Sequence, residues 1–171
     1  MMKPVILIGY MGAGKTTVGR QLAEQEGLRF CDTDAMIEEQ EKRTISEIFA
    51  SDGEAAFRDM ETALIKKLIE EKLSDTVLSV GGGLPVREEN RKLLQKLGTV
   101  VYLMASKETI VRRVADSDNR PLLKGDGLSK KVERMLSERD PLYRQAAELL
   151  IDTNGKTVEI LVKEIVQAIK K

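Results

Sequence analysis

The sequence predicts an α/β protein built on a parallel β-sheet that is covered by helices on both faces. Short apolar segments alternate with amphipathic segments along the chain, which is the pattern of repeated strand–helix units. A glycine-rich phosphate-binding motif joins the first apolar segment to the first amphipathic one. The chain has 171 residues without a linker or low-complexity tract, so we expect one domain over residues 1–171.

Five segments have the composition of short, buried strands. They are Val5–Gly9, Leu28–Asp32, Thr76–Val80, Thr99–Leu103 and Leu149–Ile151. In a parallel sheet the carboxyl ends of the strands form one edge, and ligands of open α/β proteins bind there. The functional residues are therefore expected directly after these segments.

The segments between the strands carry helix signals. The first has apolar residues at helical spacing, and Gly27 has the position of a C-terminal cap. Thr44 and Glu47 form the pattern of a capping box, and Ser129 is expected to cap a later helix. The other predicted helices are 35–41, Glu54–Lys72, Arg87–Leu97, Lys107–Ala115 and Val158–Ile169.

The segment Gly9–Thr16 fits the phosphate-binding pattern G-x-x-x-x-G-K-[ST]. Glycines let successive backbone N–H groups point at one anion, and the start of the following helix adds partial positive charge. Lys15 is expected to reach the β- and γ-phosphates of a nucleotide, and the Thr16 hydroxyl to bind Mg²⁺. The predicted nucleotide-binding residues of this motif are Gly12, Ala13, Gly14, Lys15, Thr16 and Thr17.

The charge balance and the rare residue types exclude several classes of function. Lys plus Arg and Asp plus Glu both number 28, so the chain lacks the basic excess of a general nucleic-acid or membrane-surface binder. No apolar run is long enough to span a bilayer. The absence of histidine excludes histidine acid–base chemistry. The single cysteine, Cys31, suits the reducing cytoplasm, where we expect the protein to act as a monomer.

The phosphate-binding motif alone leaves open what the protein does with its nucleotide. Guanine-specific proteins carry an Asn-Lys-x-Asp motif, and no Asn-Lys pair occurs here. Many nucleotide-driven motors end a central strand on an acidic residue, whereas the strand Thr76–Val80 runs into three glycines. The acidic groups near the metal are therefore expected from Asp32 and Asp34, at the end of the second strand.

Several short motifs occur together over nearly the whole chain. They are Gly9–Thr16, Asp32-Thr33-Asp34, Phe57-Arg58 with Glu61, Gly81-Gly82-Gly83, Asn119-Arg120-Pro121-Leu122-Leu123, Arg139-x-Pro141-Leu142-Tyr143 and Asp152-Thr153-Asn154. With these motifs in this order, the chain resembles the shikimate kinases. The resemblance implies a P-loop kinase fold whose five-stranded parallel sheet has the order 2-3-1-4-5. It also implies a substrate-binding region at about 33–61 and a lid at about 113–127.

The activity implied by the resemblance is transfer of the γ-phosphoryl group of ATP to the 3-hydroxyl of shikimate with Mg²⁺, a step toward chorismate and the aromatic amino acids. Shikimate carries a carboxylate, and arginines donate two parallel hydrogen bonds to such a group. Arg58 and Arg139 are the candidates for this contact. Asp34 is expected to position the attacking hydroxyl and is a candidate for the base. Backbone N–H groups of Gly81-Gly82-Gly83 are expected to bind a hydroxyl or the carboxylate.

The remaining candidate residues are expected to bind the nucleotide or its metal ion. Asp32 is expected to hold Mg²⁺ together with Thr16, directly or through water. Arg120 lies in the predicted lid and is the candidate for an arginine finger that neutralises charge on the transferring phosphoryl group. The resemblance places Arg113 and Asn154 beside the adenine.

Alternatives remain open on the residues alone. The protein could be another P-loop kinase, for gluconate or a nucleoside monophosphate, or a nucleotide-binding module without catalysis. The individual residues also have structural alternatives: surface ion pairs for the arginines, a turn cap for Asp32, the N-cap of helix 35–41 for Asp34, and a plain turn for the glycines.

Overall fold

The computed structural model describes residues 1–115 and 126–170. Its parallel sheet contains β1 (Val5–Ile8), β2 (Arg29–Asp32), β3 (Thr76–Ser79), β4 (Thr99–Met104) and β5 (Leu149–Asp152). The strand order is β2-β3-β1-β4-β5, as the family resemblance implies. Each of the five predicted strands is present, and each differs from its prediction by one residue at one end.

The helices follow the predicted alternation with the strands. They are α1 (Lys15–Glu26), α2 (Thr33–Glu41), α3 (Ile45–Asp52), α4 (Glu54–Glu70), the 3-10 helix η1 (Leu84–Val86), α5 (Glu88–Leu97), α6 (Lys107–Ala115), α7 (Asp126–Ala146) and α8 (Val158–Ile169). Gly27 ends α1 in the left-handed conformation, and Thr44 and Glu47 form the predicted capping box at α3. The prediction that Ser129 caps a helix is wrong, because Ser129 lies inside α7.

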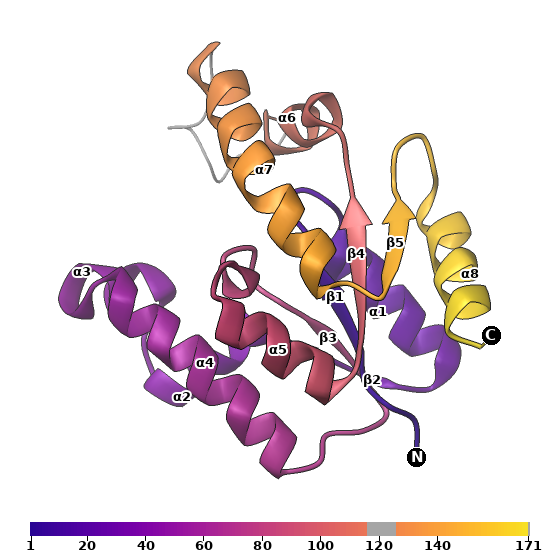
Figure 1. Ribbon diagram of the computed structural model, residues 1–171, viewed down its shortest axis with the longest axis horizontal. Helices are drawn as coiled ribbons and strands as arrows, with labels where there is room; N and C mark the ends of the chain where they lie inside the picture. Colours follow the sequence, from indigo (N-terminus) through magenta and orange to yellow (C-terminus); the bar gives the residue numbers. More distant parts are fainter. Residues whose placement is uncertain (116–125, 171) are drawn as a thin grey trace.

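The central strand β1 contributes to two cores because side chains alternate along a strand. Val5 and Leu7 pack with residues of α1 and α8 on one face of the sheet. Ile6 and Ile8 pack on the other face with residues of α4, α5 and α7. Figure 1 shows α1 and α8 side by side, with α4 and α5 across the sheet from them. All four residues of β1 are buried, as expected for the centre of a sheet covered on both faces.

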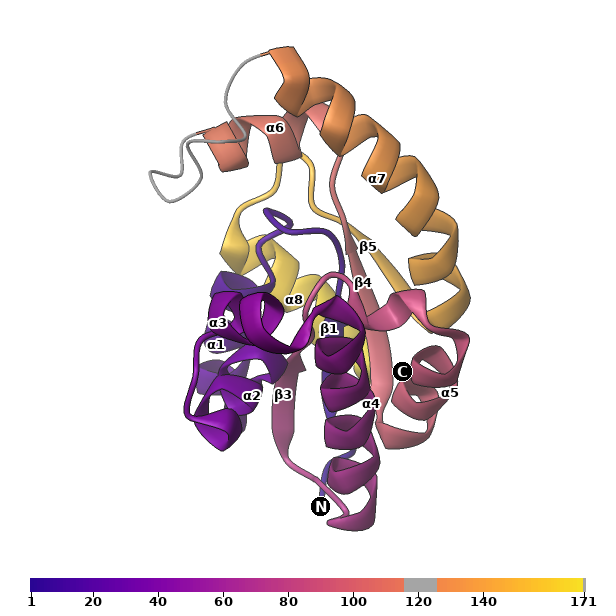
Figure 2. The same cartoon turned by 90° about the vertical axis from the view of Figure 1, so that its left-hand side faces the viewer.

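The carboxyl ends of the strands point toward the end of the molecule where α6 and the first part of α7 lie (Figure 2). The N-terminus lies at the opposite end of the sheet. The loop after β1, the start of α2 after β2 and the glycine loop after β3 therefore meet at the same edge, where a ligand site is expected. None of the described helices is long and apolar enough to cross a membrane.

The helix α7 crosses this edge and connects it to the core. It continues through Pro141, a residue that usually ends a helix because it cannot donate a backbone hydrogen bond. Tyr143 and Ala146 in its last turns are fully buried, and the helix contacts both β4 and η1. This burial stabilises the helix past the proline and fixes the side chains that α7 presents to the sheet edge.

Candidate active site

One cavity of about 480 Å³ lies at this edge, which is within the range of small-molecule sites. Its lining includes most of the residues that the sequence predicts for the site: Gly12, Gly14, Lys15, Thr16, Thr17, Asp32, Asp34, Arg58, Gly81, Gly82, Gly83 and Arg139. Ala13 is buried and packs in the core under α1 and α8. The fold therefore brings together candidates that are separated by more than a hundred residues in the sequence.

The phosphate-binding loop connects β1 to the first turn of α1. Gly12 and Gly14 have left-handed backbone conformations, with φ of 81° and 92°, which other residues rarely adopt. The ammonium group of Lys15 donates hydrogen bonds to two backbone carbonyls of the loop. Burial lowers the pKa of Lys15 to about 8, and the charges of Asp34 and Asp32 partly offset this effect. An anionic ligand at the start of α1 would raise the pKa of Lys15 again and favour its charged form.

The two aspartates reach the cavity from the junction of β2 and α2. The Asp32 carboxylate accepts a hydrogen bond from the Ala35 N–H at 3.1 Å, so Asp32 is the N-cap of α2. The alternative in which Asp34 caps this helix is wrong, because Asp34 lies in the first turn. Burial and the Asp32 charge raise the pKa of Asp34, whereas Lys15 lowers it. A hydrogen-bond donor that enters the cavity would therefore stabilise the charged form of the Asp34 carboxylate.

Each of the three consecutive glycines Gly81-Gly82-Gly83 makes room for a different polar side chain. A Cβ on the first would lie 2.7 Å from an Asp34 carboxylate oxygen. A Cβ on the second would lie 3.4 Å from Nη1 of Arg139, and one on the third would lie 2.6 Å from Cζ of Arg58. The absence of side chains in this loop therefore lets one carboxylate and two guanidinium groups approach the same stretch of backbone.

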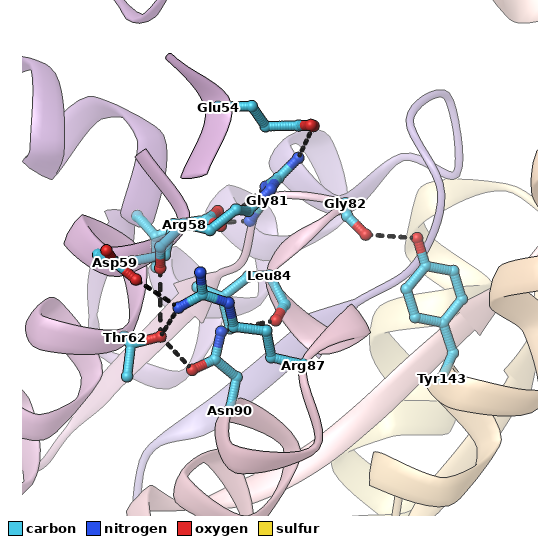
Figure 3. A network of polar contacts seen from close by, with 12 residues as sticks. Glu54, Arg58, Asp59, Thr62, Gly81, Gly82, Leu84, Arg87, Asn90 and Tyr143 are labelled. Carbon is cyan, nitrogen blue, oxygen red and sulfur yellow. Dashed lines mark hydrogen bonds and ion pairs between the residues drawn. The ribbon is translucent and has the colours of Figure 1, made fainter. Parts of the chain in front are cut away.

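The two arginines reach this backbone from different helices. Arg58 projects from α4, where its guanidinium contacts Glu61 at 2.8 Å and Glu54 at 3.4 Å; Figure 3 shows it beside the glycine loop. Arg139 projects from α7, and its guanidinium carbon lies 5.8 Å from the centre of the Tyr10 ring. Two guanidinium groups that line one cavity from different helices have the chemistry to bind an anionic group.

Glu61 lines the cavity but was not predicted as a site residue from the sequence. Its side chain is 0% exposed, and its Oε2 has no hydrogen-bond partner among the described residues. Burial raises the pKa of Glu61 to about 7, although Arg58 acts in the opposite direction. The signal in the sequence was the spacing of three residues from Arg58, which places both side chains on one face of a helix.

The chain is similar over nearly its whole length to known proteins. The sequence model described as shikimate kinase matches residues 11–170. A shikimate kinase from Geobacter metallireducens is 46% identical over 164 residues, which covers 96% of this chain and 90% of that protein. The chain belongs to the shikimate kinase family. A second relative, the shikimate kinase of Neisseria gonorrhoeae, is 45% identical over 163 residues. These residues cover 94% of this chain and 95% of that protein.

Solved structures of shikimate kinases have the same fold. The shikimate kinase from Acinetobacter baumannii in complex with shikimate is 40% identical and matches with a TM-score of 0.89, over 99% of this chain and 94% of that one. A gluconokinase from Sinorhizobium meliloti is 18% identical and matches with a TM-score of 0.61. The match covers 98% of this chain and 91% of the gluconokinase chain. At this identity the gluconokinase shows a shared fold alone. The resemblance to shikimate kinases indicated by the sequence motifs is confirmed by the family match and by the relatives above.

In this shikimate kinase family member, the residues predicted beside the adenine lie near the phosphate-binding loop and the start of α6. Arg113 donates a hydrogen bond to the Gly12 carbonyl at 2.7 Å. The carboxamide oxygen of Asn154 accepts hydrogen bonds from the Ser106 N–H and the Thr109 hydroxyl, both at 2.9 Å. Asn154 therefore fastens the loop after β5 to α6, and its contact with adenine stays a prediction, as does that of Arg113.

The lid predicted at about 113–127 is described only at its two ends. The helix α6 ends at Ala115 and α7 begins at Asp126. Arg120, the predicted arginine finger, lies outside the described residues. Its role in catalysis therefore stays a prediction that rests on the sequence motif.

Proposed function

We propose that this protein transfers the γ-phosphoryl group of ATP to the 3-hydroxyl of shikimate, giving ADP and shikimate 3-phosphate. The observation that carries the proposal is the approach of Arg58, Arg139 and Asp34 to one side-chain-free loop beside the phosphate-binding lysine. Two guanidinium groups suit a carboxylate, and a carboxylate beside them suits a ring hydroxyl. The relative from Acinetobacter baumannii whose structure contains shikimate supports this choice of substrate.

In this reaction the substrate oxygen forms a bond to the γ-phosphorus, and the bond from that phosphorus to the β–γ bridging oxygen breaks. Asp34 accepts a hydrogen bond from the attacking hydroxyl, orients it, and can take its proton as the new bond forms. Lys15 places its positive charge beside the β- and γ-phosphates, where negative charge must be stabilised. Arg58 and Arg139 hold the far end of the substrate, so that the hydroxyl is presented in line with the leaving group.

The donor groups of the cavity fit a magnesium ion, which Thr16 and Asp32 would hold. Thr16 and Asp32 both line the cavity, and only Oδ1 of Asp32 is used to cap α2. The described residues contain no cluster of three acidic, cysteine or histidine side chains, so the protein alone supplies few ligands. This is the usual arrangement for Mg²⁺ in nucleotide sites. When bound, the ion would neutralise part of the negative charge on the phosphates.

The protein is also proposed to act as a cytoplasmic monomer that binds neither nucleic acid nor membranes. The equal numbers of acidic and basic residues support the absence of a nucleic-acid partner. The single cysteine supports a reducing compartment. Sedimentation of the purified protein tests the monomer directly.

The proposed function is tested by ADP release from MgATP with shikimate, gluconate, AMP and CMP in parallel. We expect turnover with shikimate alone, its loss on chelation of Mg²⁺, and a 3-phosphate product identified by ³¹P NMR. Methyl shikimate, which lacks the carboxylate charge, is expected to bind poorly. Equal turnover with gluconate or a nucleotide, and none with shikimate, would overturn the proposal.

The carboxylate site is tested separately by calorimetry with shikimate. Arg58→Ala and Arg139→Ala are each expected to weaken binding by about 2–5 kcal/mol, because each leaves a desolvated charge without its partner. Arg134→Ala, an exposed arginine on α7 that does not line the cavity, is the matched control and is expected to bind shikimate normally. Unchanged affinity in both test variants would show that the two arginines are ordinary surface charges.

A further inference from the structure

The glycine loop is held in place by side chains from several elements. The Tyr143 hydroxyl on α7 donates a hydrogen bond to the Gly82 carbonyl at 2.7 Å (Figure 3). The Asn90 carboxamide on α5 donates to the Leu84 carbonyl at 2.9 Å, on the far side of the same loop. A loop without side chains cannot anchor itself by packing, so its orientation depends on these hydrogen bonds and on those that the Gly81 and Gly83 carbonyls accept from the backbone of η1.

The Tyr143 hydroxyl is well suited to this role. The residue is 0% exposed, and its ring packs against Tyr102 at a centroid distance of 5.0 Å. Burial raises the pKa of Tyr143 to about 12, so the hydroxyl keeps its proton at any pH at which the protein works. The carbonyl of Gly82 therefore faces a permanent donor whose position is fixed by the core.

Fixing this carbonyl also fixes a neighbouring donor. The Gly82 carbonyl and the Gly83 N–H belong to one planar trans peptide, so they point in opposite directions. Among the described residues, the N–H groups of Gly82 and Gly83 have no protein acceptor. The Gly83 end of this peptide approaches the Arg58 guanidinium. A free N–H whose direction is set by Tyr143 thus lies close to one of the two arginines.

The helix α7 that carries Tyr143 also carries the second arginine, Arg139. Arg139 and Tyr143 are four residues apart on α7, so they lie on the same face of the helix. A Cβ on Gly82 would lie 3.4 Å from the Arg139 guanidinium and 3.6 Å from the Tyr143 hydroxyl. One helix face therefore supplies a positive group to the cavity and sets the orientation of the backbone donors beside it.

We infer that Tyr143 is a positioning residue for the acceptor substrate. Its hydroxyl orients the Gly82–Gly83 peptide so that the Gly83 N–H joins Arg58 and Arg139 around the anionic group of the ligand. The inference rests on the proposed function for the identity of that ligand, shikimate. Tyr143 acts through the peptide and does not touch the substrate.

The test compares two variants that each remove one buried hydroxyl and keep the ring. Tyr143→Phe leaves the Gly82 carbonyl without its donor. Tyr102→Phe is the control, because its hydroxyl donates to Asp140 at 2.7 Å and neither residue lines the cavity. We expect Tyr143→Phe to raise the KM for shikimate about five- to tenfold, to leave the KM for ATP unchanged, and to change kcat less than the KM. Tyr102→Phe should leave both KM values unchanged, even if it lowers the Tm as much as Tyr143→Phe does.

A second readout does not depend on activity. The amide resonance of Gly83 reports on the peptide that it shares with the Gly82 carbonyl, and it should shift in Tyr143→Phe but not in Tyr102→Phe. If both variants raise the KM equally, or if Tyr143→Phe has a normal KM in an active enzyme, the inference is wrong. If the wild type does not phosphorylate shikimate, the proposed function fails. The Gly83 resonance then still decides whether the hydroxyl orients the loop.

Discussion

Replacing Glu61 by glutamine tests how strongly the site opposes a buried negative charge. Glu61 is 0% exposed, and one of its oxygens has no partner among the described residues. The structure raises the pKa of Glu61 from 4.5 to about 7. A shift of this size corresponds to about 3–4 kcal/mol, because each pKa unit is worth about 1.4 kcal/mol.

The sign follows from counting protons. Between pH 4.5 and about 7 the folded protein keeps the Glu61 proton and the unfolded chain loses it, so stability falls as the pH rises through this range. Above pH 7 the penalty is complete, and below pH 4.5 it is absent. Relative to Glu61→Gln, which cannot ionise, the wild type should therefore lose about 2–3 kcal/mol of unfolding free energy between pH 5 and pH 8.

The assay is urea unfolding of the wild type and of Glu61→Gln at pH 5 and pH 8. The change in their difference with pH is the relevant quantity, because any effect of the amide on Arg58 that does not depend on pH cancels. Glu70→Gln, at an exposed position of the same helix, is the control and should show a difference that does not change with pH. If Glu61→Gln behaves like this control, the reasoning about the buried carboxyl is refuted.

Three further substitutions test other parts of the site. Lys15→Met should lower kcat about 10³-fold or more and leave the fold intact by circular dichroism; a near-normal kcat would contradict the role of this lysine. Gly83→Ala places a Cβ 2.6 Å from Cζ of Arg58, so the KM for shikimate should rise about tenfold while the KM for ATP stays the same. Arg120→Ala should reduce kcat far more than shikimate affinity in single-turnover and binding measurements, because its expected contact is made in the reacting state.

The features that the sequence predicted well depend on local patterns. The phosphate-binding motif and the buried strands are read from a few consecutive residues, and the capping box at Thr44 is complete within four positions. The predictions that failed depend on tertiary contacts. Ser129 was expected to cap a helix but lies inside α7, which begins at Asp126. The helix also continues through Pro141 because its last turns are buried against β4 and η1, which no local pattern reports.

The site residues divide in the same way, between those that local sequence patterns indicate and those that depend on tertiary contacts. Sequence motifs identified Arg58 and Arg139, because arginine in these motifs marks anion recognition. The burial of Glu61 could not be read from its neighbours, since it depends on how α4 faces the sheet. The choice of Asp32 as the cap of α2 was missed for a different reason, because Asp32 and Asp34 both precede a helix signal and only the backbone geometry distinguishes them.

The bare backbone of Gly81-Gly82-Gly83 has a consequence for inhibitors and resistance. A compound that hydrogen-bonds to the N–H groups of this loop makes contacts that, within the loop, only a proline could delete. Adding a side chain in the loop would crowd Asp34, Arg58 or Arg139, which the proposed reaction requires. Escape from such a compound would therefore have to begin outside the loop, in residues such as Tyr143 that set the direction of its peptides.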